Sequence, residues 1–256
     1  MAGKTYKTRG IVLRKTKLAE KDLIVTVLDE SGSLLRAVAK GARKPGGSYA
    51  ARLELFSVVD LMLAQGKNLD VITSATFTDG PACIPFGVEQ AACASVLAEL
   101  LATIAQEDLP HDRLYAMAKA AFGEMARQDP PSALALCVSS LLKALAYAGF
   151  RPSFTSCVAC ASDVDLAGAA ETVPFSVEEG GVICSACSQP PDAIRIEAAT
   201  LQWCDALMRS RFEDVLAYEP STETLFAALH LIRQWTRVHA GKNLKSLDFL
   251  LASGLF

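Results

Sequence analysis

The chain has 256 residues, of which 51% are apolar, and a formal net charge of -3. This composition excludes a disordered chain, and the length suffices for one large domain or two modest ones. No uncharged apolar run reaches the length of about 18 residues that a membrane span needs, and the start, MAGKTYKTRG, has no apolar signal-peptide core. We therefore expect a cytoplasmic protein that does not enter the membrane.

Basic residues are concentrated at the amino-terminal end. Residues 1–52 hold 12 Lys/Arg against 4 Asp/Glu, whereas residues 81–256 hold 12 against 20. A basic module on an acidic body favours a polyanion-binding site at one end of the chain. A solvated basic surface without a ligand would show the same pattern, so charge alone leaves both interpretations open.

The first 80 residues have the character of strands. Apolar, β-branched runs separated by turn signals predict about five strands, over residues 6–16, 22–32, 33–41, 53–65 and 69–79. A sheet of this size would expose two edges if it stayed open, so we expect it to close into a small barrel.

From residue 85 the apolar pattern changes to the period of a helix. Val88, Ala92, Val96, Leu100 and Ile104 recur every four residues, as on a core-facing helix. Further helices are expected over residues 110–127, 129–149, 194–211 and 221–239, and the apolar tail is expected to dock onto the body. The fold class is therefore α+β, with a barrel domain over 1–80 and an all-α domain over 81–256 that carries a cysteine-rich insert at about 151–190.

Four of the eight cysteines form two Cys-x-x-Cys pairs, Cys157 with Cys160 and Cys184 with Cys187, separated by 23 residues. A structural zinc site takes four tetrahedral ligands and favours thiolates, so each pair supplies half a site. Residues 173–177 can extend, 179–181 can turn and 182–183 can return as a second strand. This layout is typical of a zinc ribbon, and four thiolates would leave no open position for catalysis.

Three other interpretations of these cysteines compete with a zinc site. A thioredoxin-like redox pair would explain one Cys-x-x-Cys only, and disulfides are disfavoured in a reducing compartment. Chance is the third, but the other four cysteines occur singly on apolar faces, where free cysteine packs as a small hydrophobe: Cys83, Cys93, Cys137 and Cys204. We favour one structural Zn²⁺.

Eight basic residues of the predicted strands, and of the loop that follows residue 40, are candidates for contacts with nucleic-acid phosphates. They are Arg14, Lys15, Lys17, Arg36, Lys40, Arg43, Lys44 and Arg52. The loop lacks the Gly-Lys-Ser/Thr ending and the following helix of a nucleotide-binding loop, which we reject. Tyr6, Tyr49 and Phe56 are available for base stacking, although core packing is the alternative for each and is favoured for Phe56.

The sequence holds no acid pair, nucleophile–base set or nucleotide loop, so we expect a binding protein and not an enzyme. One alternative is an accessory subunit of an RNA-handling complex, built from an OB-fold and a zinc ribbon. The relative affinity for single-stranded DNA and RNA would separate this alternative from a DNA-binding protein.

The chain resembles the bacterial DNA repair family RecO in segments that follow one another in the same order: GIVLRKTKLAEKDLIVTVLDESGSL, AVAKGAR, LELFSVVDLML, GFRPSFTSCVAC, FSVEEGGVICSAC and LKSLDFLL. The resemblance implies an amino-terminal OB-fold, a helical carboxy-terminal domain and a zinc element whose ligands match the four paired cysteines. Family members often carry more basic residues after Gly-Ala-Arg, whereas this chain has Pro45-Gly46-Gly47-Ser48.

The same resemblance implies a recombination mediator located in the cytoplasm with the nucleoid. Such a protein binds single- and double-stranded DNA, anneals complementary strands, works with RecR and engages single-stranded DNA-binding protein so that RecA can load. The carboxy-terminal tail of that protein is acidic with an apolar end, and it requires an apolar pocket beside cations. Candidate cations lie on or beside the second and third predicted helices, although they are also compatible with ordinary solvated helix faces: Arg113, Lys119, Arg127, Lys143 and Arg151.

Overall fold

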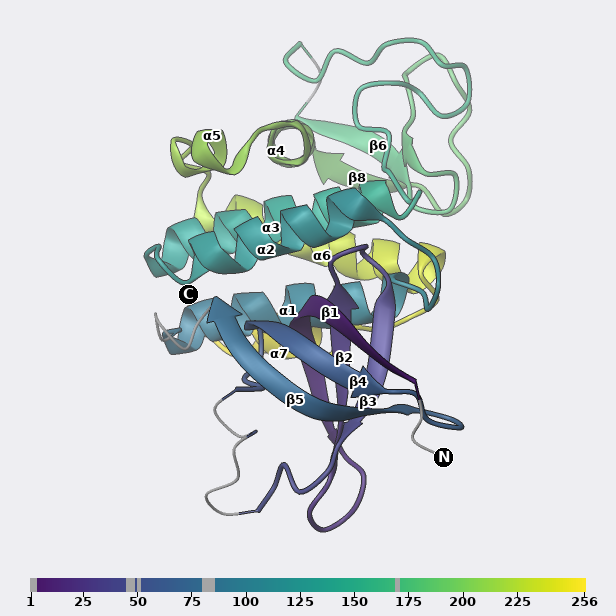
Figure 1. The fold of residues 1–256 in the computed structure, drawn as a ribbon. Coiled ribbons are helices and arrows are strands. Elements are labelled where there is room, and N and C mark those ends of the chain that lie inside the picture. Colours follow the sequence, from purple (N-terminus) through teal and green to yellow (C-terminus); the bar gives the residue numbers. More distant parts are fainter. Residues whose placement is uncertain (1–3, 45–48, 50–51, 80–85, 169–170) are drawn as a thin grey trace. The chain divides into compact units, whose positions relative to one another are not determined.

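The computed structural model describes residues 4–44, 49, 52–79, 86–168 and 171–256. The chain divides into two compact units, residues 1–128 and 129–256. The two units are coloured from purple to teal and from teal to yellow in Figure 1. The fold is α+β, as expected, and each unit has its own architecture.

The first unit contains a closed five-stranded barrel. Its strands are β1 (Thr5–Lys17), β2 (Leu23–Asp29), β3 (Leu34–Ala39), β4 (Val58–Ala64) and β5 (Asp70–Asp79). The order around the barrel is β1-β2-β3-β5-β4, and all neighbours are antiparallel except β3 and β5. This five-stranded closure is the predicted OB-type barrel, and it leaves no strand edge open.

Strand β1 closes the barrel because it pairs with two neighbours along its length. Its first half pairs with β4 and its second half with β2, and the register shifts between Val12 and Arg14. A bulge of this kind bends the strand and increases its twist, so one long strand serves both sides of the closure. Inward-facing aliphatic side chains fill the barrel, among them Val25, Val27 and Leu61, which are at most 2% exposed.

Strand β4 is shorter than the sequence predicts. The expected strand began at residue 53, but the observed strand begins at Val58. Just before it, Phe56 has a left-handed backbone (φ 67°), and its buried ring packs against Phe86 and Phe122 at centroid distances of 5.3 and 5.2 Å. The ring is a core contact, as favoured from the sequence, and it ends the extended conformation at this point.

Two helices complete the first unit. They are α1 (Val88–Ile104), which packs against β1 and β2, and α2 (Asp112–Met125), which packs against α1 and β1. Their inclusion with the barrel extends this compact unit to residue 128. The domain boundary drawn at residue 80 from the change in sequence pattern stays a prediction.

The second unit is built around α3 (Pro130–Tyr147), which contacts α4 (Ala198–Arg209), α5 (Phe212–Leu216) and α6 (Thr222–His239). Helix α3 begins where the sequence predicts, because the Asp129 side chain accepts a hydrogen bond from the Ser132 amide (2.9 Å) and proline occupies the first turn. By length and composition α3 could cross a membrane, but 67% of its apolar window is buried, as in the core helix of a globular unit. Helix α7 (Lys245–Ala252) packs on α6, which confirms the docked tail.

A small sheet accompanies these helices. Its strands are β6 (Thr172–Ser176), β7 (Gly181–Val182) and β8 (Ile194–Glu197), in the order β7-β6-β8. Residues 194–197 were expected to open a helix, but they pair with β6 instead, Ile196 opposite Val173 and Ile194 opposite Phe175. The alternation of Ile194 and Ile196 places both on one face of the sheet, so pairing with β6 overrides the helical pattern until residue 198.

Candidate metal centre and nucleic-acid interface

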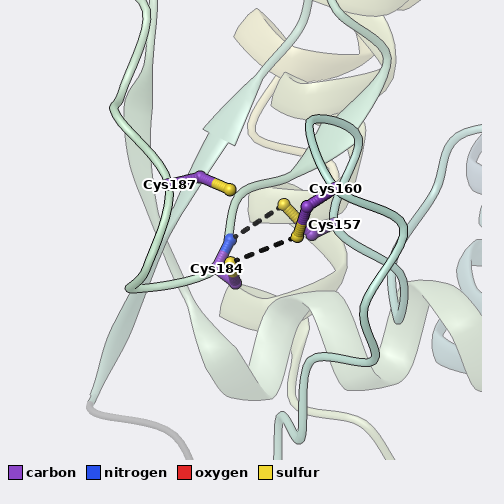
Figure 2. Close-up of side chains that lie close together, drawn as sticks. All are labelled: Cys157, Cys160, Cys184 and Cys187. Atoms are coloured by element: carbon purple, nitrogen blue, oxygen red, sulfur yellow. Dashed lines mark hydrogen bonds between the residues drawn. The ribbon is translucent and has the colours of Figure 1, made fainter.

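The four paired cysteines come together in space. Figure 2 shows Cys157 and Cys160 from one loop facing Cys184 and Cys187 from another, and their sulfur atoms all lie within 4.8 Å of one another. The sulfurs of Cys160 and Cys184 are 3.7 Å apart. Tetrahedral coordination with Zn–S bonds of about 2.3 Å separates neighbouring sulfurs by about 3.8 Å, so the donor set fits a four-coordinate thiolate site.

Local backbone turns present the sulfurs to the centre of the cluster. After the first pair, Ala161 has a left-handed backbone (φ 62°) and donates its amide to the Cys157 carbonyl (2.8 Å). The amide of Cys187 donates to the Cys184 carbonyl (3.2 Å), and the amide of Cys184 donates across to the Cys157 sulfur (3.3 Å). Each Cys-x-x-Cys therefore folds as a tight turn that directs two sulfurs to the same side.

The surroundings of the cluster favour thiolates at two positions. Burial disfavours the Cys157 thiolate, but hydrogen bonds from the amides of Cys184, Ala159 and Cys160 outweigh it and lower the pKa of this thiol to about 6. Hydrogen bonding to Ser162, whose hydroxyl lies 2.7 Å from the sulfur, lowers the pKa of Cys160.

At the fourth position, the neighbouring sulfurs of Cys160 and Cys184 raise the pKa of Cys187 to about 12. Four sulfurs this close can all become thiolates only if a cation shares their charge.

The hairpin between the pairs forms as the sequence predicts. Strands β6 and β7 pair through Phe175 opposite Val182, and Gly180 turns the chain with φ 98°. Gly181 leaves no room for a side chain, because a Cβ there would lie 2.2 Å from the Ser153 carbonyl oxygen. The chain leading into Cys157 can therefore run against β7, where the Val182 amide donates to that carbonyl (3.0 Å).

Aromatic contacts attach this hairpin to α6. The Trp235 ring packs on Phe175 of β6 at a centroid distance of 6.0 Å, and its indole N–H donates to the Phe150 carbonyl (2.9 Å). The ring centroids of His239 and Trp235 are 4.2 Å apart, and the His239 Nε2 is 2.7 Å from the Val177 carbonyl oxygen. The cysteine cluster is therefore joined to a hairpin that packs on α6 in the core of the second unit.

The remaining described cysteines, Cys93, Cys137 and Cys204, are all fully buried. Their placement confirms that they belong to the core, and Cys83 lies outside the described residues. Among the described residues, no other group of three or more His, Cys, Asp or Glu side chains has metal-site geometry.

The barrel brings two of the predicted phosphate contacts into one row. Arg14 of β1 lies opposite Thr26 of β2, which in turn lies opposite Arg36 of β3. Since Val25 and Val27 face the barrel interior, Thr26 and its two arginine neighbours lie on the outer face. Both arginines are exposed and separated by two strand spacings, about 10 Å. We name this outer surface of β1, β2 and β3 the arginine face.

Other candidate cations gather at the end of the barrel beyond this face. Lys17 ends β1 and Lys40 follows β3, and the loops 18–22 and 40–44 both project from the lower end of the barrel in Figure 1. Five of the eight candidates have exposed side chains that form no hydrogen bond or ion pair within the described residues: Arg14, Lys17, Arg36, Lys40 and Lys44.

The other three candidates have partners within the barrel unit. Arg43 donates to the carbonyls of Ala19 and Glu20 at 3.1 and 2.9 Å, and thereby joins the two loops. Lys15 forms an ion pair with Glu54 (3.1 Å), and Arg52 donates to the Ala75 carbonyl (3.4 Å). These contacts position the loops, and residues 45–48, where the chain departs from the family pattern, lie outside the described residues.

The chain matches known proteins over most of its length. The family model "Recombination protein O N terminal" matches residues 1–81, and "Recombination protein O C terminal" matches residues 87–248. DNA repair protein RecO from Bifidobacterium longum strain DJO10A is 34% identical over 96% of this chain and 98% of the relative, and that of B. longum subsp. infantis is 33% identical with the same coverage. The chain belongs to the RecO family.

RecO family membership makes the chain a DNA repair and recombination protein. It confirms the likeness drawn from the sequence motifs over almost the whole length of the chain. The structure adds contacts that no sequence motif indicated, such as the Ser162 hydroxyl beside Cys160 and the Arg43 side chain across the two loops. A hydroxyl near a cysteine pair and an arginine in a polar loop are too common to predict such contacts.

The five cations suggested for partner docking on this RecO protein do not share one environment. Arg113 and Arg151 are exposed, with no hydrogen bond or ion pair to their side chains within the described residues. Lys119 pairs with Asp79 (3.6 Å), and Arg127 pairs with Glu124 (3.4 Å). These four side chains remain at the surface.

Lys143 differs from them, because its side chain is partly buried in the second unit. Its ammonium donates to the Ser139 hydroxyl (2.7 Å) and the Leu207 carbonyl (2.6 Å) and lies 5.4 Å from the centre of the Phe212 ring. Burial lowers the pKa of Lys143 from 10.5 to about 8. The side chain therefore links α3 to the end of α4, and its cation is not free at the surface.

The lowered pKa of Lys143 predicts a pH dependence of stability. Between pH 8 and 10.5 the folded state binds fewer protons at this residue than the unfolded state, so the free energy of unfolding should rise with pH across that window, by about 2 kcal/mol. Lys143→Met should lose this rise and should be at least as stable as the parent near neutral pH, because it removes a buried charge. Urea unfolding of both proteins at several pH values measures the difference, with the exposed Lys245→Met as control. Parallel pH profiles for the parent and Lys143→Met would contradict the assignment.

Proposed function

We propose that this chain is a recombination mediator that binds single- and double-stranded DNA and anneals complementary strands. The observation that carries the proposal is the row Arg14–Thr26–Arg36 on the outer face of the barrel, with the free cations of the adjoining loops. Unpaired cations along a groove or strip neutralise phosphates and release counterions, which supplies sequence-independent affinity for either form of DNA. RecO family membership supports this interpretation.

Annealing of this kind requires no catalytic residue. Two strands repel each other through their phosphates, and bound cations reduce that repulsion while the bases pair. We therefore propose that the chain acts by binding and not as an enzyme.

We further propose that the four-cysteine cluster holds one Zn²⁺ with a structural role. The ion would be bound by Cys157, Cys160, Cys184 and Cys187, which leave no position open for a substrate. The Zn²⁺ would neutralise part of the negative charge of the four thiolates, and its bonds to them would attach the hairpin 172–183 to the loop 157–160.

For partners, we propose RecR and single-stranded DNA-binding protein, with the loading of RecA as the outcome, in the cytoplasm at the nucleoid. These partners rest on the RecO family. For the acidic tail of single-stranded DNA-binding protein, Arg113 and Arg151 are the candidates whose cations are free, whereas the ammonium of Lys143 is engaged inside the second unit.

A strand-annealing assay tests the proposed function. Two complementary oligonucleotides carrying a fluorescence donor and acceptor are mixed with the full-length protein, either bare or coated with single-stranded DNA-binding protein. We expect annealing to accelerate in both states and to weaken steeply with added salt. Annealing no faster than without protein would contradict the proposal, and acceleration of bare strands alone would leave annealing but exclude the mediator role.

A further inference from the structure

The aromatic residues of the barrel unit are buried or partly buried. Residues 1–128 contain seven aromatic side chains, and none of them is exposed: Tyr6, Tyr49, Phe56, Phe77, Phe86, Tyr115 and Phe122. All seven are among the described residues. Phe56 and Phe122 are buried and the other five are partly buried. Proteins that hold single strands by their bases use exposed aromatic rings as stacking platforms, and this unit has no fully exposed ring of that kind.

Two tyrosines of the barrel unit are held in place by hydrogen bonds. The Tyr6 hydroxyl donates to the Asp70 carboxylate, and burial together with this carboxylate raises the pKa of Tyr6 well above its ordinary value. The Tyr49 hydroxyl donates to the Ile72 carbonyl (3.2 Å). Both rings pack against the barrel core, so turning either toward a base would break a hydrogen bond and expose apolar surface.

The arginine face presents groups that suit phosphates. Arg14 and Arg36 flank Thr26, whose side chain is 7% exposed, and the outward-facing neighbours Ile24 and Val38 are half-buried aliphatic residues. Guanidinium groups bind phosphate oxygens through two parallel N–H donors. At the end of the barrel, Leu18 lies beside Lys17 and is 50% exposed. Among the described strands and loops of the barrel, no other large apolar side chain is exposed to this degree.

From this we infer that the arginine face recognises the phosphodiester backbone alone and leaves the bases of a bound strand unstacked on protein. The inference rests on the proposed function and deepens it, since it names the part of the nucleic acid that is recognised. Bases that are not stacked on side chains stay available for pairing with a second strand. A strand held in this way is therefore ready to anneal without first being released.

The test compares an oligothymidylate with an abasic oligomer of the same length and the same number of phosphates. Binding of each to the full-length protein is followed by fluorescence anisotropy over a series of salt concentrations. We expect dissociation constants within about twofold of each other and equal slopes of log affinity against log salt, because the phosphate contacts are the same. Leu18→Ala should leave the ratio of the two constants unchanged.

Stacking of even one base would weaken abasic binding by about fivefold or more. A loss of that size for the abasic oligomer would overturn the inference while leaving DNA binding intact. If Leu18→Ala weakened thymidylate binding but not abasic binding, Leu18 would be a base contact, and the inference would again fail. If neither oligomer bound, the proposed DNA binding itself would be wrong, and the inference would fall with it.

Discussion

Replacing Cys184 with serine is expected to release the metal from the cluster and to destabilise residues 129–256 strongly. The Cys184 sulfur lies 3.7 Å from that of Cys160, and its amide donates to Cys157, so this residue contacts both ligands of the opposite pair. Structural zinc contributes its binding free energy directly to folding. We expect less than one tenth of the parent's metal content and a loss of about 3 kcal/mol or more in the free energy of unfolding.

Metal content is measured after purification without chelator under reducing conditions. Unfolding is followed by tryptophan emission, because Trp235 packs directly on β6 of the hairpin. Cys204→Ser is the matched control: the residue is fully buried in the same unit but outside the cluster, so this variant should keep the metal and lose only about 1–2 kcal/mol. Full metal content in Cys184→Ser, or none in the freshly purified parent, would contradict the site.

Removal of two cations from the arginine face is expected to weaken DNA binding by about tenfold or more. In the double variant Arg14→Gln, Arg36→Gln, two exposed guanidinium groups without protein partners are lost, so the barrel core should be unaffected. Each phosphate contact with a single strand contributes about 0.7 to the slope of log affinity against log salt, so the slope should fall by about 1.4. Because backbone contacts carry no sequence information, the loss should be the same for any sequence.

A control variant with the same change in net charge separates the effect of contacts on the arginine face from the effect of the total charge of the protein. Lys4→Gln, Lys7→Gln also removes two exposed cations, but Lys7 pairs with Met62 on the β1–β4 side of the barrel. This control should lose less than about threefold in affinity and keep the parent's salt slope. An equal loss in both double variants would show that total charge, and not the arginine face, determines binding. Thermal unfolding of each variant checks that the barrel remains folded.

The element types and the cysteine pairs followed from local patterns in the sequence. Helix α3 was predicted to begin at Asp129, because a capping aspartate and an early proline act on their own first turn and require no tertiary contact. The hairpin between the cysteine pairs was predictable for a similar reason, since Gly180 turns two short apolar strands toward each other. The four residues of the cysteine cluster were likewise predictable from their spacing, because a Cys-x-x-Cys turn directs two sulfurs to one side whatever surrounds it.

Predictions from the sequence failed where contact with a distant segment decided the backbone conformation. Residues 194–197 fit a helical period, yet β6 supplied a partner strand that held them extended. Phe56 lies in an apolar run that predicts a strand, but contact with Phe86 and Phe122 held it in a left-handed turn. Local propensities differ by less than about 1 kcal/mol, so burial of a large side chain or a new set of strand hydrogen bonds outweighs them.

The separation of surface cations from engaged ones was also a matter of tertiary structure. From the sequence, Arg36, Arg43 and Lys143 are equivalent basic residues in polar or amphipathic surroundings. In the folded chain Arg36 is exposed on a barrel face, Arg43 donates to two carbonyls of a neighbouring loop, and Lys143 is partly buried beside the Phe212 ring. The sequence alone predicted the strands of the barrel, most of the helices and the four paired cysteines, because these depend on local spacing and period. The tertiary structure alone decides which cations are free to bind a ligand and which aromatic rings pack in the core, because both depend on contacts with residues distant in the sequence.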